Sequence, residues 1–365
     1  MRILVVNAGS SSLKLSVLAP DDELSGACDL PAPQGDAVER DIADAIGRFG
    51  SVDAVGHRIV HGGTEFTGPV IIDSRVRSAL AALTDLAPLH QPKSLAALDA
   101  VTRVLPETPA IACFDTAFHA LMPASASTYA LPAAWRRRWA LRRYGFHGLS
   151  HAYASRRTAE LLDRPLGDLR IVTCHLGAGA SLAAVQNGRS VDTTMGFTPL
   201  DGLIMATRSG AVDPGLILWL QEHAGTPAQE LAATLEYRSG LMGLAGTPDM
   251  REVIARAAAG DQDAILGFDT YIHRLRAGIA SMAAAMNGLD ALAFTGGVGE
   301  NSPEVRAAAG AGLTFLGVAI EPAPNEQPTG DEIISAGGPA ITLVKAREDL
   351  EIAHQVRGVL AGERR

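Results

Sequence analysis

Short apolar runs separated by glycine-rich and serine-rich turns open the chain. Residues 2–6 form a β-rich run, and residues 13–18 alternate apolar with polar side chains as a half-buried strand does. Residues 7–12 between them are almost all turn formers. The pattern predicts a hairpin over residues 2–18 with a Gly/Ser-rich loop.

The same pattern returns later in the chain. The apolar run at residues 171–174 leads through the glycine-rich stretch 175–181 into a second apolar run. A third glycine loop, residues 295–302, follows the apolar run 291–294, and Pro303 then marks the first turn of a predicted helix. Two similar hairpins in one chain indicate a duplicated domain.

Helical patterns alternate with these strands. They cover residues 94–104, 150–162 and 263–286, and such alternation is typical of α/β folds with a mainly parallel sheet. Residues 348–360 carry apolar side chains at helical spacing, so we expect this last helix to pack on a lobe. The polar, Asp-rich residues 20–50 contain one weak helix and are expected to be a surface excursion. We therefore expect two α/β lobes with a cleft between them.

Composition agrees with a folded chain of this size. Of its 365 residues, 47% are hydrophobic and 19% are charged, and the length favours two domains. One of the longest apolar stretches, residues 277–289, is interrupted by polar residues and glycine and is shorter than the roughly 20 residues of a membrane-spanning helix. Polar residues follow the start too soon for a signal-peptide core. We expect no membrane span and a cytoplasmic location.

The net charge argues against a nucleic-acid-binding surface, and the cysteine positions argue against disulfides and cysteine metal sites. A net charge of −9 argues against a general nucleic-acid surface, which needs a basic field. Cys28, Cys113 and Cys174 are isolated from one another, and the last two lie in apolar runs. Buried thiols are therefore expected rather than disulfides or metal ligands.

Residues 7–12, with Lys14 nearby, are a candidate phosphate site. Their small side chains leave successive backbone N–H groups open to phosphate oxygens, although an ordinary hairpin turn explains the same residues. The chain has no G-x-x-x-x-G-K-[ST] motif, which excludes a strand-to-helix P-loop. Ser11 and Lys14 match the S-x-x-K motif of penicillin-recognising enzymes, but neither S-D-N nor K-T-G occurs, which excludes that class.

Two histidine pairs, His57/His61 and His147/His151, have the spacing of metal ligands on a helix. The first pair lies in a β-like run, where its side chains would be about 13 Å apart, so no structural zinc is expected. A single histidine is more often a satisfied hydrogen-bonding residue than a catalyst. What favours function is the company of charged residues in similar glycine-rich loops, namely Arg58, Asp115 and Arg208.

Motifs along nearly the whole chain resemble, in order, the signatures of the acetate kinase family. They are residues 7–14, HRIVHGG at 57–63, FDTAFH at 114–119, YGFHGLSH at 144–151, HLG at 175–177, MGFTPLDG at 195–202, TRSG at 207–210, DMR at 249–251 and TGGVGENS at 295–302. That family belongs to the acetate and sugar kinase and actin superfamily. The resemblance implies duplicated ribonuclease-H-like lobes, residues 1–119 with 350–365 and residues 120–349, which clamp ATP in an interdomain cleft, and it implies a homodimer.

The implied activity is reversible phosphoryl transfer from ATP to acetate, giving acetyl phosphate and ADP. A carboxylate is ionised at pH 7, so its attack on the γ-phosphoryl group needs no general base. The difficulty is bringing two anions together, which requires positioning and positive charge. By resemblance, Arg58 holds the acid or the moving phosphoryl group, while His147 and Arg208 stabilise its equatorial oxygens. Asp115 is the family's usual acid/base residue, but organising a metal or Arg58 is physically easier.

The resemblance also implies the other contacts. Mg²⁺, with Mn²⁺ as an alternative, would bridge the ATP phosphates, with Asn7 and Glu348 as its carried-over ligands. The tail of the acid would lie against Val60, Leu89, Phe146 and Pro199. Nucleotide contacts would come from Lys14, His175, Leu176, Gly177, Ala178, Gly179, Asp249, Met250, Arg251, Gly297, Val298, Gly299, Glu300 and Asn301.

Several positions depart from the family pattern, and they bear on affinity or substrate preference rather than on reaction class. They are Gln91 for Asn, Ala178 and Ala180 for Asn and Ser, Ala211 for an acidic residue, and Ala346 and Arg347 before Glu348. One methylene in an apolar pocket is worth only about 1–3 kcal/mol, so propionate or another short-chain acid stays open as the substrate. The non-enzymatic alternative is a regulatory protein that binds ATP and has lost transfer, which has no obvious need for the acid-side groups.

Overall fold

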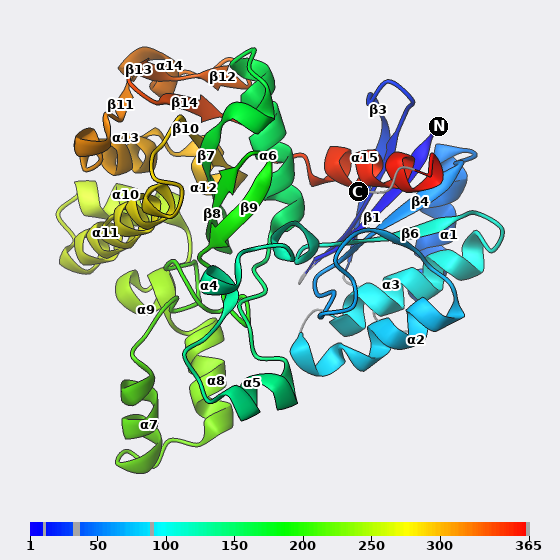
Figure 1. The fold of residues 1–365 in the computed structure, drawn as a ribbon, viewed down its shortest axis with the longest axis horizontal. Helices are drawn as coiled ribbons and strands as arrows, with labels where there is room; N and C mark the ends of the chain where they lie inside the picture. The colour runs from blue at the N-terminus through cyan, green and yellow to red at the C-terminus, as the bar shows by residue number, and fades with distance from the viewer. Residues whose placement is uncertain (10–11, 32–36, 88–90, 363–365) are drawn as a thin grey trace. The chain divides into compact units, whose positions relative to one another are not determined.

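The computed structural model describes residues 1–9, 12–31, 37–87 and 91–362 (Figure 1). The chain forms two compact units. Unit 1 contains Met1–Ala120, Phe146–Tyr153 and Arg347–Arg365, and unit 2 contains Leu121–Gly145 and Ala154–Ala346. Residues 146–153, placed in the C-terminal lobe by the sequence, pack within unit 1. The predicted lobe boundaries themselves stay a prediction.

The sheet of unit 1 has the strand order β3-β2-β1-β4-β6-β5. Its strands are β1 (Ile3–Ala8), β2 (Ser12–Leu18), β3 (Leu24–Pro31), β4 (Ala54–Ile59), β5 (Val70–Ile71) and β6 (Ala110–Phe114). Strands β1, β4 and β6 run parallel, whereas β2, β3 and the edge strand β5 are antiparallel to their neighbours. The hairpin predicted for residues 2–18 is therefore confirmed as β1–β2.

The sheet of unit 2 has the order β9-β8-β7-β10-β14-β12. Its strands are β7 (Arg170–Leu176), β8 (Ala180–Gln186), β9 (Arg189–Thr193), β10 (Ala291–Thr295), β12 (Glu332–Ile333) and β14 (Ala340–Leu343), with β11 (Ala319–Ile320) and β13 (Ser335–Gly337) paired separately. Parallel and antiparallel pairings follow the same sequence as in the first sheet. This repetition confirms the predicted duplication of a ribonuclease-H-like α/β sheet.

Helices pack on both sheets. Those of unit 1 are α1 (Ala37–Phe49), α2 (Ser74–Ala82), α3 (Gln91–Val104) and α15 (Glu348–Leu360), and α6 (Gly148–Leu161) begins in unit 1 and ends in unit 2. Those of unit 2 are α4 (Ala124–Ser127), α5 (Ala133–Trp139), α7 (Pro214–Glu222), α8 (Ala228–Tyr237), α9 (Gly240–Ala245), α10 (Met250–Ala258), α11 (Gln262–Ala285), α12 (Gly296–Asn301), α13 (Pro303–Ala311) and α14 (Pro322–Glu326). Short 3-10 turns cover Thr84–Leu86, Ala117–His119, Leu166–Asp168 and Thr314–Leu316. None of the helices formed by described residues is long and apolar enough to cross a membrane.

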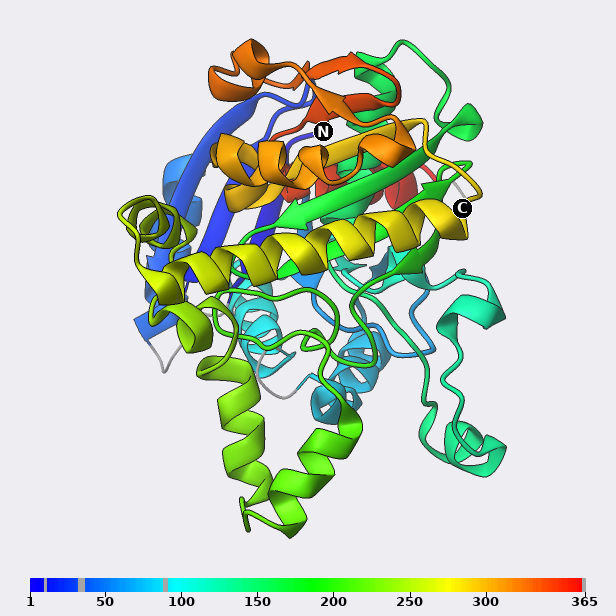
Figure 2. The ribbon, with the colours of Figure 1, turned by 90° about the vertical axis from the view of Figure 1, so that its left-hand side faces the viewer.

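The long helix α11 lies along one face of the second sheet (Figure 2). Its N-cap is Asp261, whose carboxylate accepts hydrogen bonds from the backbone N–H groups of Asp263 and Ala264. Gly278 faces β8, and a Cβ there would lie 2.7 Å from Leu182 Cδ1. Glycine therefore allows the close contact between this helix and the sheet.

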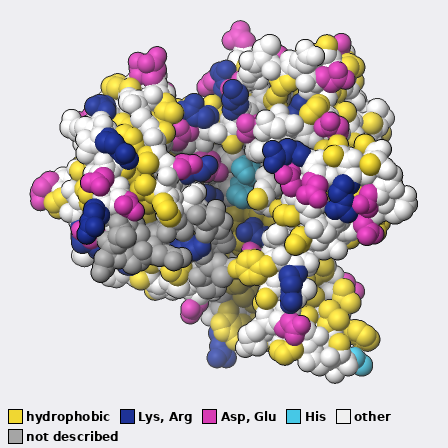
Figure 3. Space-filling view, turned by 180° about the vertical axis from the view of Figure 1, so that it is seen from behind, with side chains coloured by type: hydrophobic (Ala, Val, Ile, Leu, Met, Phe, Trp, Pro, Cys, Tyr) yellow, Lys and Arg dark blue, Asp and Glu magenta, His cyan; other side chains and the backbone are white. Residues whose placement is uncertain are grey.

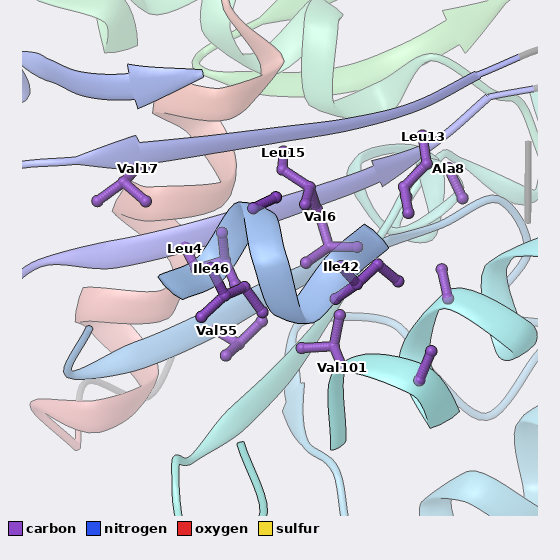
Figure 4. Close-up of a cluster of buried hydrophobic side chains, with 13 residues drawn as sticks. Leu4, Val6, Ala8, Leu13, Leu15, Val17, Ile42, Ile46, Val55 and Val101 are labelled. Carbon is purple, nitrogen blue, oxygen red and sulfur yellow. The ribbon is translucent and has the colours of Figure 1, made fainter. Parts of the chain in front are cut away.

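Alternation along the strands of unit 1 builds two cores, one on each face of its sheet. Leu4 and Val6 of β1 pack against Ile42 of α1 (Figure 4). Val5, which points the other way, packs in a cluster with Ile352 of α15. Because burying such a side chain contributes roughly 1.5–3 kcal/mol, these layers fix the faces on which polar residues of the same strands emerge.

Two predictions from the sequence, for residues 20–50 and for the cysteines, can be compared with the structure. The weak helix predicted within residues 20–50 is confirmed as α1, but the expected surface excursion is wrong, because β3 extends the sheet and α1 buries Ile42 and Ala45 completely. The apolar residues of α1 are few but share one face, so overall polarity concealed them. The prediction of buried thiols is confirmed for Cys113 and Cys174, whereas Cys28 is half-buried.

Candidate active site

A row of polar side chains follows the apolar positions on the α15 face of the first sheet. On the parallel strands β1, β4 and β6, the residues before this row pack against α15 or are glycine. The next positions on the same face are Asn7 on β1, Arg58 on β4 and Asp115 directly after β6. Since alternate residues share a face, the parallel strands bring these three side chains together at their carboxyl ends.

Arg58 is the centre of this polar row. Its Nε and Nη2 donate hydrogen bonds to the two carboxylate oxygens of Asp115, at 3.0 and 2.6 Å. Its Nη1 donates to Oδ1 of Asn7 at 3.0 Å and lies 3.7 Å from Oε2 of Glu348, the first residue of α15. Asn7 Nδ2 in turn donates to Glu348 Oε2 at 3.1 Å. The four residues form one connected network.

Burial makes this network electrostatically strong. The side chain of Asp115 is 1% exposed, and those of Arg58 and Glu348 are 16% and 15% exposed. Burial would lower the pKa of Arg58, but the carboxylates of Asp115 and Glu348 outweigh that effect and raise it. Burial raises the pKa of Asp115, while Arg58 opposes the rise. A bidentate pairing of this kind holds the guanidinium in one orientation.

The loop before α6 approaches the same carboxylate. Gly148 N donates to the backbone oxygen of Asp115 at 2.9 Å, and the backbone N–H of His147 donates to the Asp115 side chain. A Cβ on Gly148 would collide with Asp115 O, so only glycine permits this approach. His147 itself has a φ of +56°, in the left-handed region that non-glycine residues rarely adopt. The structure thus places His147 beside Asp115.

Lys14 lies next to this row. It pairs with Asn7 across the β1–β2 hairpin, so the two side chains share a face of the sheet, and Lys14 is exposed. Of the residues predicted to contact the tail of the acid, Val60 and Phe146 are buried, and Phe146 makes an edge contact with His61 at 5.5 Å between ring centroids. Leu89 lies outside the described residues.

Arg208 and Pro199 belong to unit 2 and contact each other there. Arg208 Nη1 donates to Pro199 O at 3.3 Å, and Nε donates to Oε1 of Glu236 at 2.7 Å. The side chains of Arg208 and Glu236 are 19% and 14% exposed. Among the described residues, none accepts a hydrogen bond from Arg208 Nη2. Glu236 therefore orients Arg208 and leaves one edge of the guanidinium available.

Two glycine loops of unit 2 lie at the ends of neighbouring strands. His175 at the end of β7 pairs in register with Thr295 of β10, and the backbone turns back where Gly177 N donates to Gly179 O at 2.9 Å. Leu176 is buried, and the carbonyl of Ala178 accepts from Ala206 N at 3.1 Å. Both of these hydrogen bonds of the first loop join backbone groups.

The second loop forms α12. Glu300 accepts from Gly296 N at 3.0 Å and from Ala346 N at 2.9 Å, and Asn301 Nδ2 donates to Gly297 O at 2.8 Å. No described atom beyond its chain neighbours lies within 4 Å of a Cβ built at Gly297. The same helix carries the other two predicted contacts, Val298 and Gly299. Its backbone at Gly297 is open to a ligand.

Residues 249–251, which are predicted to contact the nucleotide, differ in how exposed their side chains are. Asp249 caps α10 by accepting from Arg251 N at 2.9 Å, and Arg251 Nη2 donates to Asp249 Oδ2 at 2.6 Å. Met250 is only 4% exposed and packs inside unit 2. Asp249 and Arg251 are accessible on the surface, whereas the Met250 side chain is not.

Three residues of these sites had no predicted role. Thr116 Oγ1 accepts from Gly62 N at 3.0 Å, and His119 Nε2 lies 3.0 Å from Phe146 O. Glu236 pairs with Arg208, as described above. Thr116 and His119 belong to the FDTAFH motif, which could have drawn attention to them. Glu236 lies near the end of α8 in no recognisable motif.

Comparison with known proteins places the chain in a family. The profile of the acetokinase family matches residues 36–354. The acetate kinase of Leifsonia xyli subsp. xyli is 44% identical over 394 residues, covering 99% of each chain. The crystal structure of Porphyromonas gingivalis acetate kinase matches with a TM-score of 0.91 and 34% identity, covering 98% of this chain and 99% of that one. A propionate kinase structure from Francisella tularensis matches with a TM-score of 0.89 and 34% identity, covering 97% and 98%. The chain belongs to the acetokinase family.

Proposed function

We propose that this chain acts as an acetate kinase, transferring the γ-phosphoryl group of ATP reversibly to acetate to give acetyl phosphate and ADP. The family match over the chain supports this reaction class. The observation that carries the proposal is the buried Arg58, fixed by Asp115 on one side and by Asn7 on another. A guanidinium prepared in this way suits a reaction between two anions.

The chemistry requires no proton transfer. A carboxylate oxygen of acetate forms a bond to the γ-phosphorus, and the bond from that phosphorus to the bridging oxygen of ADP breaks. Acetate is already ionised at neutral pH, so no base is needed to activate it. Asp115 accepts two hydrogen bonds from Arg58 and is 1% exposed, which supports a role in holding Arg58 rather than in accepting a proton.

Positive charge supplies the catalytic effect. In this proposal Arg58 holds the acid or the moving phosphoryl group, and His147 and Arg208 stabilise its equatorial oxygens. Asp115 and Glu236 hold the two arginines in position before the substrates bind, so little reorganisation is needed during transfer. Catalysis of phosphoryl transfer depends mainly on such positioning and charge stabilisation.

The residues beside Arg58 also suit Mg²⁺. Asn7 and Glu348 offer an amide oxygen and a carboxylate, which are hard oxygen donors, and they are joined by a hydrogen bond of 3.1 Å. Within the four-residue network, two carboxylates face one guanidinium. We propose Asn7 and Glu348 as the residues that hold the ion, directly or through water. When bound, Mg²⁺ would neutralise charge on the ATP phosphates.

The proposal also concerns which short-chain acid is the substrate. Val60 and Phe146 are buried next to the Arg58 network, and Pro199 contacts Arg208, so these residues are proposed to contact the tail of the acid. The propionate kinase structure is nearly as similar as that of the acetate kinase. Propionate is therefore the second candidate substrate.

We extend the proposal to a cytoplasmic homodimer. Apolar side chains gather on the part of unit 2 that carries α7 and α8, at the lower right in Figure 3. Leu216, Leu218 and Trp219 of α7 are 48%, 56% and 53% exposed. An exposed cluster of this kind commonly marks a protein interface, and a second copy of the chain is the partner that the family resemblance suggests.

The test is acyl phosphate formation. The chain is incubated with ATP, Mg²⁺ and either acetate or propionate, and the product is trapped as a hydroxamate. Arg58→Ala should lower kcat by at least about 10³-fold. Arg77→Ala is a matched control in unit 1, because Arg77 makes an equally bidentate pair with Asp99 at 2.7 Å outside the network. ATP binding without acyl phosphate from any acid would instead support the regulatory alternative.

A further inference from the structure

We propose that His119 is a positioning residue for phosphoryl transfer: its buried ring holds the Phe146 carbonyl and thereby fixes the backbone of His147 against Asp115. This inference rests on the proposed function. His119 belongs to the short 3-10 turn Ala117–His119, which follows Asp115 directly. It does not need to touch the substrates.

Residues 115–119 hold successive peptide groups of the loop before α6. His119 Nε2 lies 3.0 Å from Phe146 O. The Asp115 carboxylate accepts from the backbone N–H of His147, and Asp115 O accepts from Gly148 N at 2.9 Å. The segment that orients Arg58 therefore also fixes the loop that carries His147.

The loop needs this support because of its conformation. His147 has a φ of +56°, which is unfavourable for a side chain with a Cβ and persists only when its surroundings determine it. The flanking groups, Phe146 O and Gly148 N, are the ones that the 115–119 segment binds. Removing the contact to Phe146 O would free one side of the strained residue.

The ring of His119 is itself fixed. It is fully buried, and its centroid lies 5.5 Å from that of Phe118 and 5.7 Å from that of His151, both in edge contacts. Burial lowers the pKa of His119 to about 4, so the ring is neutral at pH 7. Because a carbonyl can only accept, the proton of the neutral ring lies on Nε2 and is donated to Phe146 O.

The expected effect is on the rate of transfer rather than on binding. His119 acts through the position of His147 relative to Arg58, and both are proposed to act on the moving phosphoryl group. A small displacement of a catalytic group lowers the rate strongly, whereas substrate affinity depends on many other contacts. Loss of the His119 contact should therefore lower kcat and leave KM nearly unchanged.

The experiment compares three variants at His119. His119→Gln keeps an N–H donor near the position of Nε2, His119→Asn is polar but too short to reach Phe146 O, and His119→Met has no donor. We expect kcat to fall by about 10–100-fold for Asn and Met, with KM for acetate and for ATP within about 3-fold, and to be largely restored in Gln. His57→Met is the matched control, because His57 is equally buried, on the opposite face of β4 from Arg58.

Each outcome decides the inference. Wild-type kcat in folded His119→Met or His119→Asn would overturn it. Equal losses in the Gln, Asn and Met variants, in proportion to their loss of thermal stability and matched by His57→Met, would show a merely structural role and also overturn it. An active wild-type chain in either case leaves the proposed function standing. A wild-type chain that forms no acyl phosphate would overturn the proposed function first.

Discussion

Arg58 donates hydrogen bonds from Nε and Nη2 to both carboxylate oxygens of Asp115, at 3.0 and 2.6 Å. Both oxygens of this carboxylate are therefore engaged by a cation that stays protonated at any physiological pH. In this arrangement Asp115 serves to hold Arg58, and a role as proton acceptor would require it to leave its partner.

Replacing Asp115 by Asn should reduce kcat by about 10²–10³-fold, because the guanidinium loses its charged support. The shape of the pH profile of kcat/KM should stay the same, since no proton is transferred by this residue. Steady-state kinetics from pH 5.5 to 8.5 for both proteins make the comparison. A limb that is present in the wild type and absent from Asp115→Asn would restore the acid/base role.

Glu236→Gln should lower kcat by roughly 10-fold with ATP binding retained, because it weakens the 2.7 Å pair that orients Arg208. Glu230→Gln on the same helix is the control, since Glu230 is 57% exposed and lies 4.0 Å from Arg238. Kinetic constants of the two variants, measured with acetate and ATP, provide the check. Equal rates in both variants would remove Glu236 from the proposed site.

Stability should fall as the pH is lowered from 6.5 towards 5. Burial lowers the pKa of each of His57, His61 and His119 to about 4, whereas an unfolded histidine titrates near 6.5. The unfolded state then binds more protons in this window, so the free energy of unfolding decreases by about 1–2 kcal/mol per histidine. Urea unfolding at pH 7.5, 6.5, 5.8 and 5.0 measures it. His57→Met should weaken the dependence, and a flat curve in the wild type would contradict the prediction.

Trp219→Glu on α7 should convert the proposed homodimer to monomers. The indole of Trp219 is exposed in the single chain and would be buried in the dimer, so the substitution would bury a carboxylate in the interface. Light scattering after size-exclusion chromatography reports the mass. Phe315→Glu is the control, since Phe315 is 72% exposed and lies outside α7. A wild-type monomer would remove the proposed interface. A dimer that survives Trp219→Glu would place the interface elsewhere.

The residues that meet around Arg58 could be named from the sequence because each lies in a local motif. The motifs identify Arg58 and Asp115, and the hairpin of residues 2–18 follows from turn chemistry, whereas the sheet face that the two residues share is visible only in the structure. The acidic partner of Arg208 could not be predicted, because Glu236 joins it only through the packing of α8. The contact of His119 with a backbone carbonyl likewise leaves no trace in side-chain patterns.

The prediction for residues 20–50 is wrong because it rests on overall composition rather than on the positions of the apolar side chains. Amino-acid counts describe a stretch as polar, whereas burial depends on which side chains share a face. Ile42 and Ala45 are completely buried on one side of α1, although the helix is polar on average. A strand at a sheet edge, such as β3, carries an even weaker signal because one of its long edges has no neighbour.

The repeated sheet order brings different side chains to equivalent strand ends in the two halves of the chain. By strand register, the positions that carry Asn7, Arg58 and Asp115 in the first sheet correspond to His175, Thr295 and Ala346 in the second. The first sheet thus presents a cation balanced by carboxylates at its strand ends, whereas the carboxylate at the equivalent ends of the second sheet, Glu300, accepts hydrogen bonds from the backbone N–H groups of Gly296 and Ala346. Equivalent positions of the two repeated sheets therefore carry different chemistry, although the same strand order positions them.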